Sequence, residues 1–119
     1  MKTMKQSILQ EGQTTKRILP YGRQYVIVAI YEVLDKSGAC YEKTDSSTIS
    51  SEMSIYGNTS RFSISFNEQI SGTELLVTMV HPCEGLSSFG IQRAITAVAD
   101  NISQYLENEI VMNSLSQKA

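Results

Sequence analysis

The apolar residues of this chain change their spacing on passing Pro82. In four segments between residues 39 and 81 they fall at every second position, whereas between residues 91 and 106 they recur every three or four positions. A period of two places alternate side chains on opposite faces of a strand, and a period of 3.6 gathers them in one stripe on a helix. The sequence therefore predicts consecutive strands followed by one long amphipathic helix.

The segments with strand spacing are separated by turn-forming pairs such as Gly57-Asn58 and Ser71-Gly72. Four segments show this pattern: 39–44, 49–56, 61–67 and 73–81. A further short strand is expected near 15–19, ahead of Pro20. The second face of 73–81 is partly apolar, which predicts a strand that is central in the sheet or covered on both sides.

Segment 24–34 allows two readings. Five of its apolar residues share one helical stripe: Val26, Ala29, Ile30, Val33 and Leu34. Gly38 then stands where a helix C-terminus turns left-handed. Its β-branched residues favour a strand instead, which could pair with 39–44 through a hairpin. We favour a helix at about 23–37.

The C-terminal part has the most regular helical pattern of the chain. Ser87 and Ser88 can each cap its start, and one apolar stripe follows: Ile91, Ala94, Ile95, Val98, Ile102, Tyr105 and Leu106. The helix is expected to end between 108 and 113. The predicted fold is α+β, with an antiparallel sheet of about four to five strands packed against this helix. We expect a flexible lead-in at 1–13, a single domain at 14–112 and a frayed tail at 113–119.

Composition excludes several classes of function. The 119 residues suffice for one domain with its own core. The net charge is −2, from 10 basic and 12 acidic residues, and no dense basic stripe is present, so nucleic acid is not an expected partner. No apolar stretch has the length of a signal peptide core or a membrane span. We therefore expect a cytoplasmic chain whose two cysteines are reduced thiols.

Residues with catalytic potential are few. His81 is the only histidine, and Cys83 lies two positions after it. A nucleophilic thiol needs a base in contact and a third group that orients this base, and no such group is evident. A zinc site formed by His81, Cys83 and Cys40 would lack paired ligand spacing. We predict no catalytic residue, no metal ligand and no cofactor.

The element order resembles a known family. Leu34-Asp-Lys-Ser-Gly38, the segment Glu42-Lys-Thr-Asp45 with Ile49, the successive strands and the last long helix are similar to a reduced helix-grip domain of the START/polyketide-cyclase-like (SRPBCC) superfamily. The pattern is also compatible with an uncharacterised small bacterial family of similar element order. The resemblance spans roughly residues 13–110. It implies an apolar ligand between the sheet and the last helix.

The matched apolar faces and this resemblance together define a hypothetical ligand site. Its residues would be Met53, Ile55, Phe62, Ile64, Phe66, Val77, Met79, His81, Ile91, Ile95, Val98 and Ile102. The leading hypothesis is therefore non-enzymatic binding of a small apolar or amphipathic ligand. In this hypothesis His81 is at the strand end and faces the same side as Val77 and Met79.

Two alternatives stay open. One is a protein-interaction or homo-oligomeric structural domain, because segment 25–34 is too apolar for one buried side and because Leu76, Val80, Tyr41 and Tyr56 fall on less buried faces. The other is a small enzyme that uses His81 together with Cys83 or a carboxylate.

Overall fold

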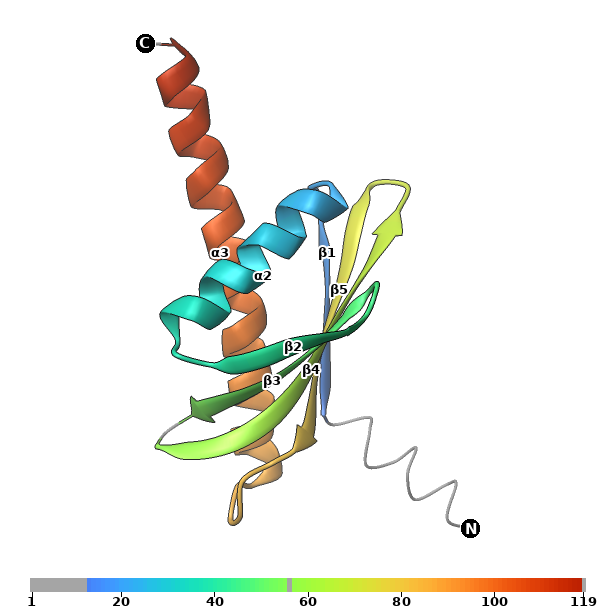
Figure 1. Cartoon of the computed structure of the whole chain (residues 1–119), viewed down its shortest axis with the longest axis vertical. Helices are drawn as coiled ribbons and strands as arrows, with labels where there is room; N and C mark the ends of the chain where they lie inside the picture. The colour runs from blue at the N-terminus through green and yellow to red at the C-terminus, as the bar shows by residue number, and fades with distance from the viewer. Residues whose placement is uncertain (1–12, 56, 119) are drawn as a thin grey trace.

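The chain folds into one antiparallel sheet with two helices on the same face (Figure 1). The computed structural model describes residues 13–55 and 57–118, and it describes no side chain for residues 55, 58 and 110–118. The elements are β1 (Thr14–Leu19), α2 (Arg23–Lys36), β2 (Cys40–Asp45), β3 (Thr48–Ile55), β4 (Asn58–Gln69), β5 (Gly72–His81) and α3 (Ser88–Lys118). The predicted α+β class, with a sheet of about five strands and a second helix, is confirmed.

The segment with two readings is the helix α2. Its buried residues are those of the predicted stripe: Val26, Ala29, Ile30, Val33 and Leu34. At the C-terminus the N–H of Gly38 bonds to Asp35 O at 3.1 Å and that of Ala39 to Leu34 O at 3.0 Å. This is the Schellman arrangement, and Gly38 supports it with a φ of 70°. Gly38, at the end of the apolar stripe, therefore correctly indicated a helix in this segment.

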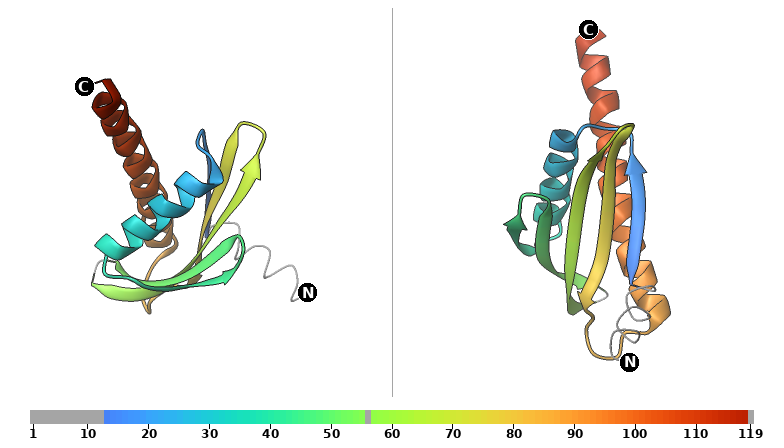
Figure 2. Two further views of the ribbon diagram at one scale, coloured as in Figure 1. Left: turned by 45° about the horizontal axis from the view of Figure 1, so that its top comes forward. Right: turned by 90° about the vertical axis from the view of Figure 1, so that its right-hand side faces the viewer.

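The sheet has the order β1-β5-β4-β3-β2, with every neighbouring pair antiparallel. Strands β2 to β5 follow each other as a meander, and β1 joins the free edge of β5. The face toward the helices is apolar and almost fully buried: Ile49, Met53, Phe62, Ile64, Phe66, Leu75, Val77 and Met79. Both helices cover this face, as Figure 2 shows from two further directions.

Among the described residues no helix lies on the opposite face of the sheet, and the side chains of that face are largely polar. Strand β5 lies between β1 and β4, so the prediction of a central strand holds. Its outer side chains include Leu76, which is partly buried, and Val80, which is 44% exposed. Apolar side chains on the outer face of β5 are therefore partly covered by the strands beside it, and no described element forms a second layer over them.

Helix α3 begins as the sequence predicts and ends later. The Ser87 hydroxyl accepts a hydrogen bond from the Gly90 N–H at 3.1 Å, which makes Ser87 the N-cap. The expected end between 108 and 113 differs from the structure, where the helix continues to Lys118. No Gly or Pro interrupts the sequence in these turns, so nothing in them stops the helix. Its last turns extend beyond the sheet (Figure 1).

The flexible lead-in that the sequence predicts at 1–13 lies outside the described residues except for Gln13, and so does Ala119 of the predicted tail. Gln13 already takes part in the sheet, because its carbonyl accepts a hydrogen bond from the Met79 N–H at 2.9 Å. Within the described part of the chain, no helix is long and apolar enough to cross a membrane.

Candidate functional site

The residues predicted to line a ligand site are mostly core residues. Ten of them belong to one buried cluster, each at most 6% exposed: Met53, Phe62, Ile64, Phe66, Val77, Met79, Ile91, Ile95, Val98 and Ile102. The side chain of Ile55 lies outside the described residues, and His81 is exposed. The structure thus brings ten of the twelve together in one buried cluster.

Helix α2 also fills the space between the sheet and α3. Its five buried residues join the same cluster, which the prediction of a ligand site did not include. Of three surface hollows, with volumes of about 210, 350 and 270 Å³, none is lined by any of the ten buried residues. The ligand site stays a prediction, and the packing of these side chains favours a solid core at this place.

Cys40 and His81, two of the residues considered for catalysis or metal binding, lie on different strands of the sheet. Cys40 on β2 is opposite Glu52 on β3, Glu52 is opposite Arg61 on β4, and Arg61 is opposite His81 on β5. Cys40 and His81 are therefore separated by three strand spacings, about 14 Å. Among the described residues, none forms a hydrogen bond or ion pair with the His81 ring. Nor do these residues include a cluster that could hold a metal ion.

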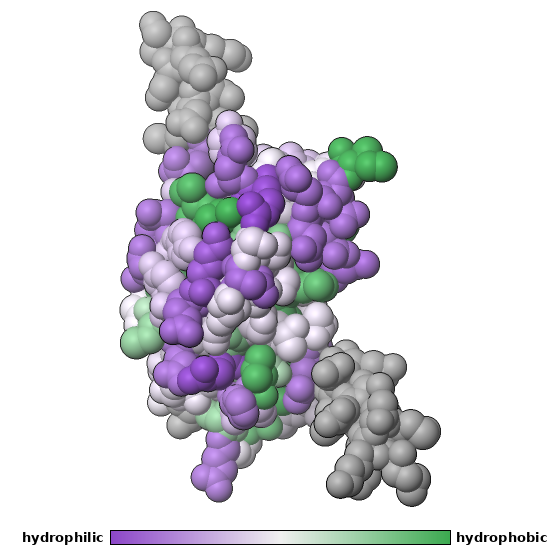
Figure 3. Space-filling model, turned by 45° about the vertical axis from the view of Figure 1, so that its right-hand side comes forward, coloured by the Kyte–Doolittle hydropathy of each residue, from purple (hydrophilic) through white to green (hydrophobic). Residues whose placement is uncertain are grey.

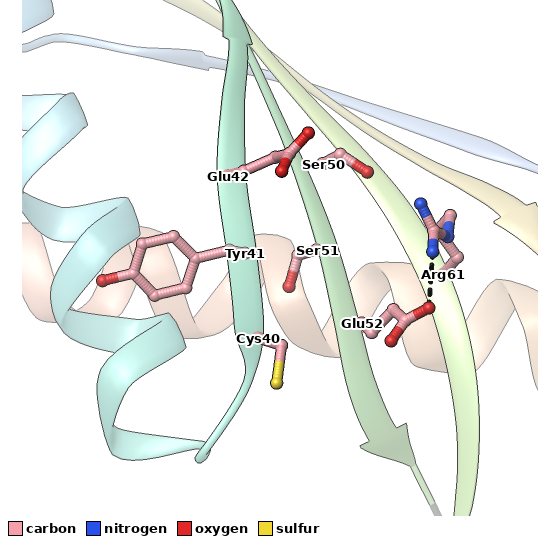
Figure 4. Close-up of a pocket in the computed structure, with 7 residues that line it drawn as sticks. All are labelled: Cys40, Tyr41, Glu42, Ser50, Ser51, Glu52 and Arg61. Carbon is pink, nitrogen blue, oxygen red and sulfur yellow. Dashed lines mark hydrogen bonds and ion pairs between the residues drawn. The ribbon is translucent and has the colours of Figure 1, made fainter.

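Figure 4 shows the hollow of about 210 Å³ at one end of this row. The Arg61 guanidinium donates to Glu52 Oε2 at 2.6 Å, so the two charges across β3 and β4 neutralise each other. Cys40 and Glu42 line the other side. Tyr41 points away from the ion pair, toward α2 (Figure 4). The hollow is open, and two of its three charged side chains, Glu52 and Arg61, already form an ion pair.

Cys83 lies in a loop that is attached to a neighbouring strand. The backbone N–H of Cys83 donates to the Ser60 hydroxyl at 2.9 Å, which anchors the loop after β5 to β4. The thiol of Cys83 is partly exposed, and Cys40 is exposed. Among the described residues, no hydrogen bond joins either thiol to a base of the kind that nucleophilic catalysis requires.

Helix α2 and strand β2 share a partly exposed surface that contains three tyrosines. Tyr25 and Val28 are each 53% exposed and lie on successive turns of α2. Tyr31 continues the same row and stacks on Tyr41 of β2, with ring centroids 5.4 Å apart and planes inclined by 28°. We call Tyr25, Val28, Tyr31 and Tyr41 the tyrosine surface.

One end of the tyrosine surface is acidic. The Tyr41 hydroxyl donates to Asp35 Oδ1 at 2.7 Å, and this hydrogen bond raises the pKa of Tyr41, with smaller contributions from burial and from the charges of Asp35 and Glu32. Glu32 and Asp35 belong to the last turns of α2. Lys36 is directed elsewhere, since its ammonium lies 5.5 Å from the centroid of the Tyr105 ring on α3.

The sequence signalled only part of this surface. The excess of apolar residues at 25–34 pointed to an exposed apolar side, and Tyr25 and Val28 are the residues that account for it. Of the other residues singled out, Tyr41 is 36% and Val80 44% exposed, and Tyr56 lies outside the described residues. Apolar side chains on the face drawn in Figure 3 form small separate patches among polar ones.

Comparison with known proteins gives little further information. No family model matches the chain, and no curated protein matches it. A solved structure of an uncharacterised protein from Rhizobium leguminosarum is similar, with 13% identity and a TM-score of 0.49, covering 80% of this chain and 93% of that one. This is a distant resemblance of the backbone and implies no activity for this chain.

Proposed function

We propose that this chain is a non-enzymatic protein-interaction domain that binds an amphipathic helix along the tyrosine surface. The observation that carries the proposal is the 53% exposure of both Tyr25 and Val28 in a helix whose other side is fully buried. Isolated exposed apolar residues are ordinary. Here they occupy successive turns and adjoin two stacked tyrosines, and tyrosine is enriched in protein interfaces.

The spacing of the surface supports a helical partner. Tyr25, Val28 and Tyr31 are each three residues apart, so they form a ridge of the kind that fits the groove between side chains of a second helix. The acidic end at Glu32 and Asp35 adds a preference for a partner with positive potential there. A tyrosine ring also contributes a large contact area with few rotatable bonds, which limits the entropy lost on binding.

Photo-crosslinking in cells that express the chain naturally would test this proposal. A benzophenone amino acid would replace Val28 in one variant and Ile70 in a control, because Ile70 is 108% exposed at the β4–β5 turn, off the tyrosine surface. We expect discrete protein adducts from position 28 that position 70 does not give. These adducts should disappear when Tyr25→Ser is added. Adducts from neither position, or equal adducts from both, would argue against the proposal.

The ligand site between the sheet and α3 stays a second prediction, together with the helix-grip resemblance. Two helices on one face of an antiparallel sheet support it, whereas the packed core counts against a large ligand. Native mass spectrometry of the purified chain would test it, because a bound apolar molecule should appear as a mass increment. For the third reading, an enzyme that uses His81, no described residue forms a hydrogen bond or ion pair with that ring to support it.

A further inference from the structure

We infer that the helix bound by the tyrosine surface is α2 of a second copy of this chain, packed antiparallel with Val28 on the twofold axis. The inference rests on the proposed function of this surface. In an isologous contact every residue of the patch meets the same patch on the other copy. For α2 this pairs Tyr25 of one copy with Tyr31 of the other, because the two tyrosines lie three residues on either side of Val28.

The charges on the outer side of α2 favour the antiparallel direction. Both outward acidic residues, Glu32 and Asp35, lie in its C-terminal half. Parallel packing would bring each carboxylate next to its own copy, which is repulsive. Antiparallel packing about Val28 separates the two Asp35 residues by about 21 Å along the helix, at a rise of 1.5 Å per residue.

The N-terminus of α2 provides the complement for this acidic end. Its first turn contains no acidic residue, and the N-cap Gly22 contributes no side-chain hydrogen bond. The partial positive charge of the helix start therefore has no acidic partner within the first turn of α2 itself. In the antiparallel pair Glu32 and Asp35 of the second copy lie beside Gln24 and Tyr21, at this start.

The edge of the sheet is a less suitable contact between copies. Strand β2 is an edge strand with all six residues exposed, and it could pair with a second β2. A twofold pairing of its middle places either Glu42 opposite Glu42 or Lys43 opposite Lys43. Like charges directly opposite each other destabilise a pair of strands. The charges of β2 thus disfavour pairing of two β2 strands, whereas the charges of α2 favour antiparallel packing of two α2 helices.

Disulfide crosslinking of the whole chain would test the inference. The two native thiols are first removed by Cys40→Ser and Cys83→Ser. In this background Val28→Cys should form a disulfide-linked dimer under mild oxidation, because a residue on the axis meets its own copy within the reach of a disulfide. Tyr25→Cys, off the axis, and Ile18→Cys, 50% exposed on the outer side of the sheet, should stay largely monomeric under the same conditions.

Each result decides between arrangements. Equal linking by Val28→Cys and Tyr25→Cys would indicate parallel packing and overturn the inferred geometry. Light scattering over a range of concentrations should show a mass of two chains for the wild type and one chain for Val28→Asp. A wild-type monomer throughout would overturn the second copy as partner. The proposed function would then still stand if position 28 crosslinks to a different protein, and would fail if position 28 gives no adduct.

Discussion

The hydroxyl of Tyr41 donates a hydrogen bond of 2.7 Å to Asp35 Oδ1, and this contact ties the edge strand β2 to the last turn of α2. Among the described strands, β2 pairs only with β3. The stacking of Tyr41 on Tyr31 adds a second contact between β2 and the helix. The tyrosine surface therefore depends on β2 and α2 holding a fixed relative position.

The same hydrogen bond predicts a pH dependence. It raises the pKa of Tyr41 above 10.0 in the folded chain. A folded-state pKa above the unfolded value means that the stabilisation is complete below about pH 10 and is lost as the pH rises through the raised pKa. Ultraviolet titration of tyrosinate should show one group titrating later in the wild type than in Asp35→Asn. The group is assigned by its absence in Tyr41→Phe, and coincident curves for wild type and Asp35→Asn would contradict the prediction.

Two buried serines on the helix-facing side of the sheet allow a direct comparison of a hydroxyl without a hydrogen-bond partner and one with a partner. Ser51 is 1% exposed and its hydroxyl has no hydrogen-bond partner among the described residues. Ser60 is 2% exposed and its hydroxyl accepts the bond from the Cys83 N–H. A buried hydroxyl without a partner costs about 1–3 kcal/mol, whereas a satisfied one contributes about 0.5–1.5 kcal/mol.

We therefore expect Ser51→Ala to leave the free energy of unfolding unchanged or to raise it, and Ser60→Ala to lower it by about 1 kcal/mol. Urea denaturation of both variants, followed by circular dichroism, measures the two changes under one set of conditions. A loss of stability in Ser51→Ala as large as that in Ser60→Ala would show that the Ser51 hydroxyl has a partner after all.

Local pattern was sufficient to predict most elements of the fold. The alternation in β3, β4 and β5 follows from one buried face, and Gly38 together with the stripe from Val26 to Leu34 identified α2. The strand order was not predictable, because the pairing of β1 with β5 joins residues more than 50 positions apart, such as Thr15 and Val77. Nothing in the local spacing of either strand encodes that choice.

The predicted ligand site and the tyrosine surface also depend on contacts that local sequence does not determine. Ten of the apolar residues assigned to a ligand site lie in one buried cluster, but whether a space remains among them depends on the fit of α2, α3 and the sheet together. The tyrosine surface needed the structure because Tyr31 and Tyr41 meet only after Gly38 reverses the chain. The excess of apolar residues in 25–34 indicated that one side of this segment is exposed. It did not indicate which strand lies beside that exposed side.

Two glycines with positive φ should respond differently to alanine. Gly72, with φ of 150°, has no room for a side chain, because a Cβ there would lie 2.0 Å from Leu19 O. Gly38, with φ of 70°, has nothing within 4 Å of the same position. Gly38→Ala should cost about 1–2 kcal/mol for the left-handed backbone alone. Gly72→Ala should cost more, since β5 must also move away from β1, and thermal unfolding of both variants compares them.

The last prediction separates a solid core from a ligand cavity. Ile95 on α3 is fully buried in the central cluster. If the side chains fill the space, Ile95→Ala should lower the free energy of unfolding by about 2–5 kcal/mol and create an apolar cavity. Benzene should then raise the melting temperature of this variant and leave that of the wild type unchanged, because an empty apolar cavity binds such a probe. Stabilisation of the wild type by benzene would instead indicate an existing cavity and strengthen the predicted ligand site. If benzene has no effect on a folded Ile95→Ala variant, the core closes around the deletion.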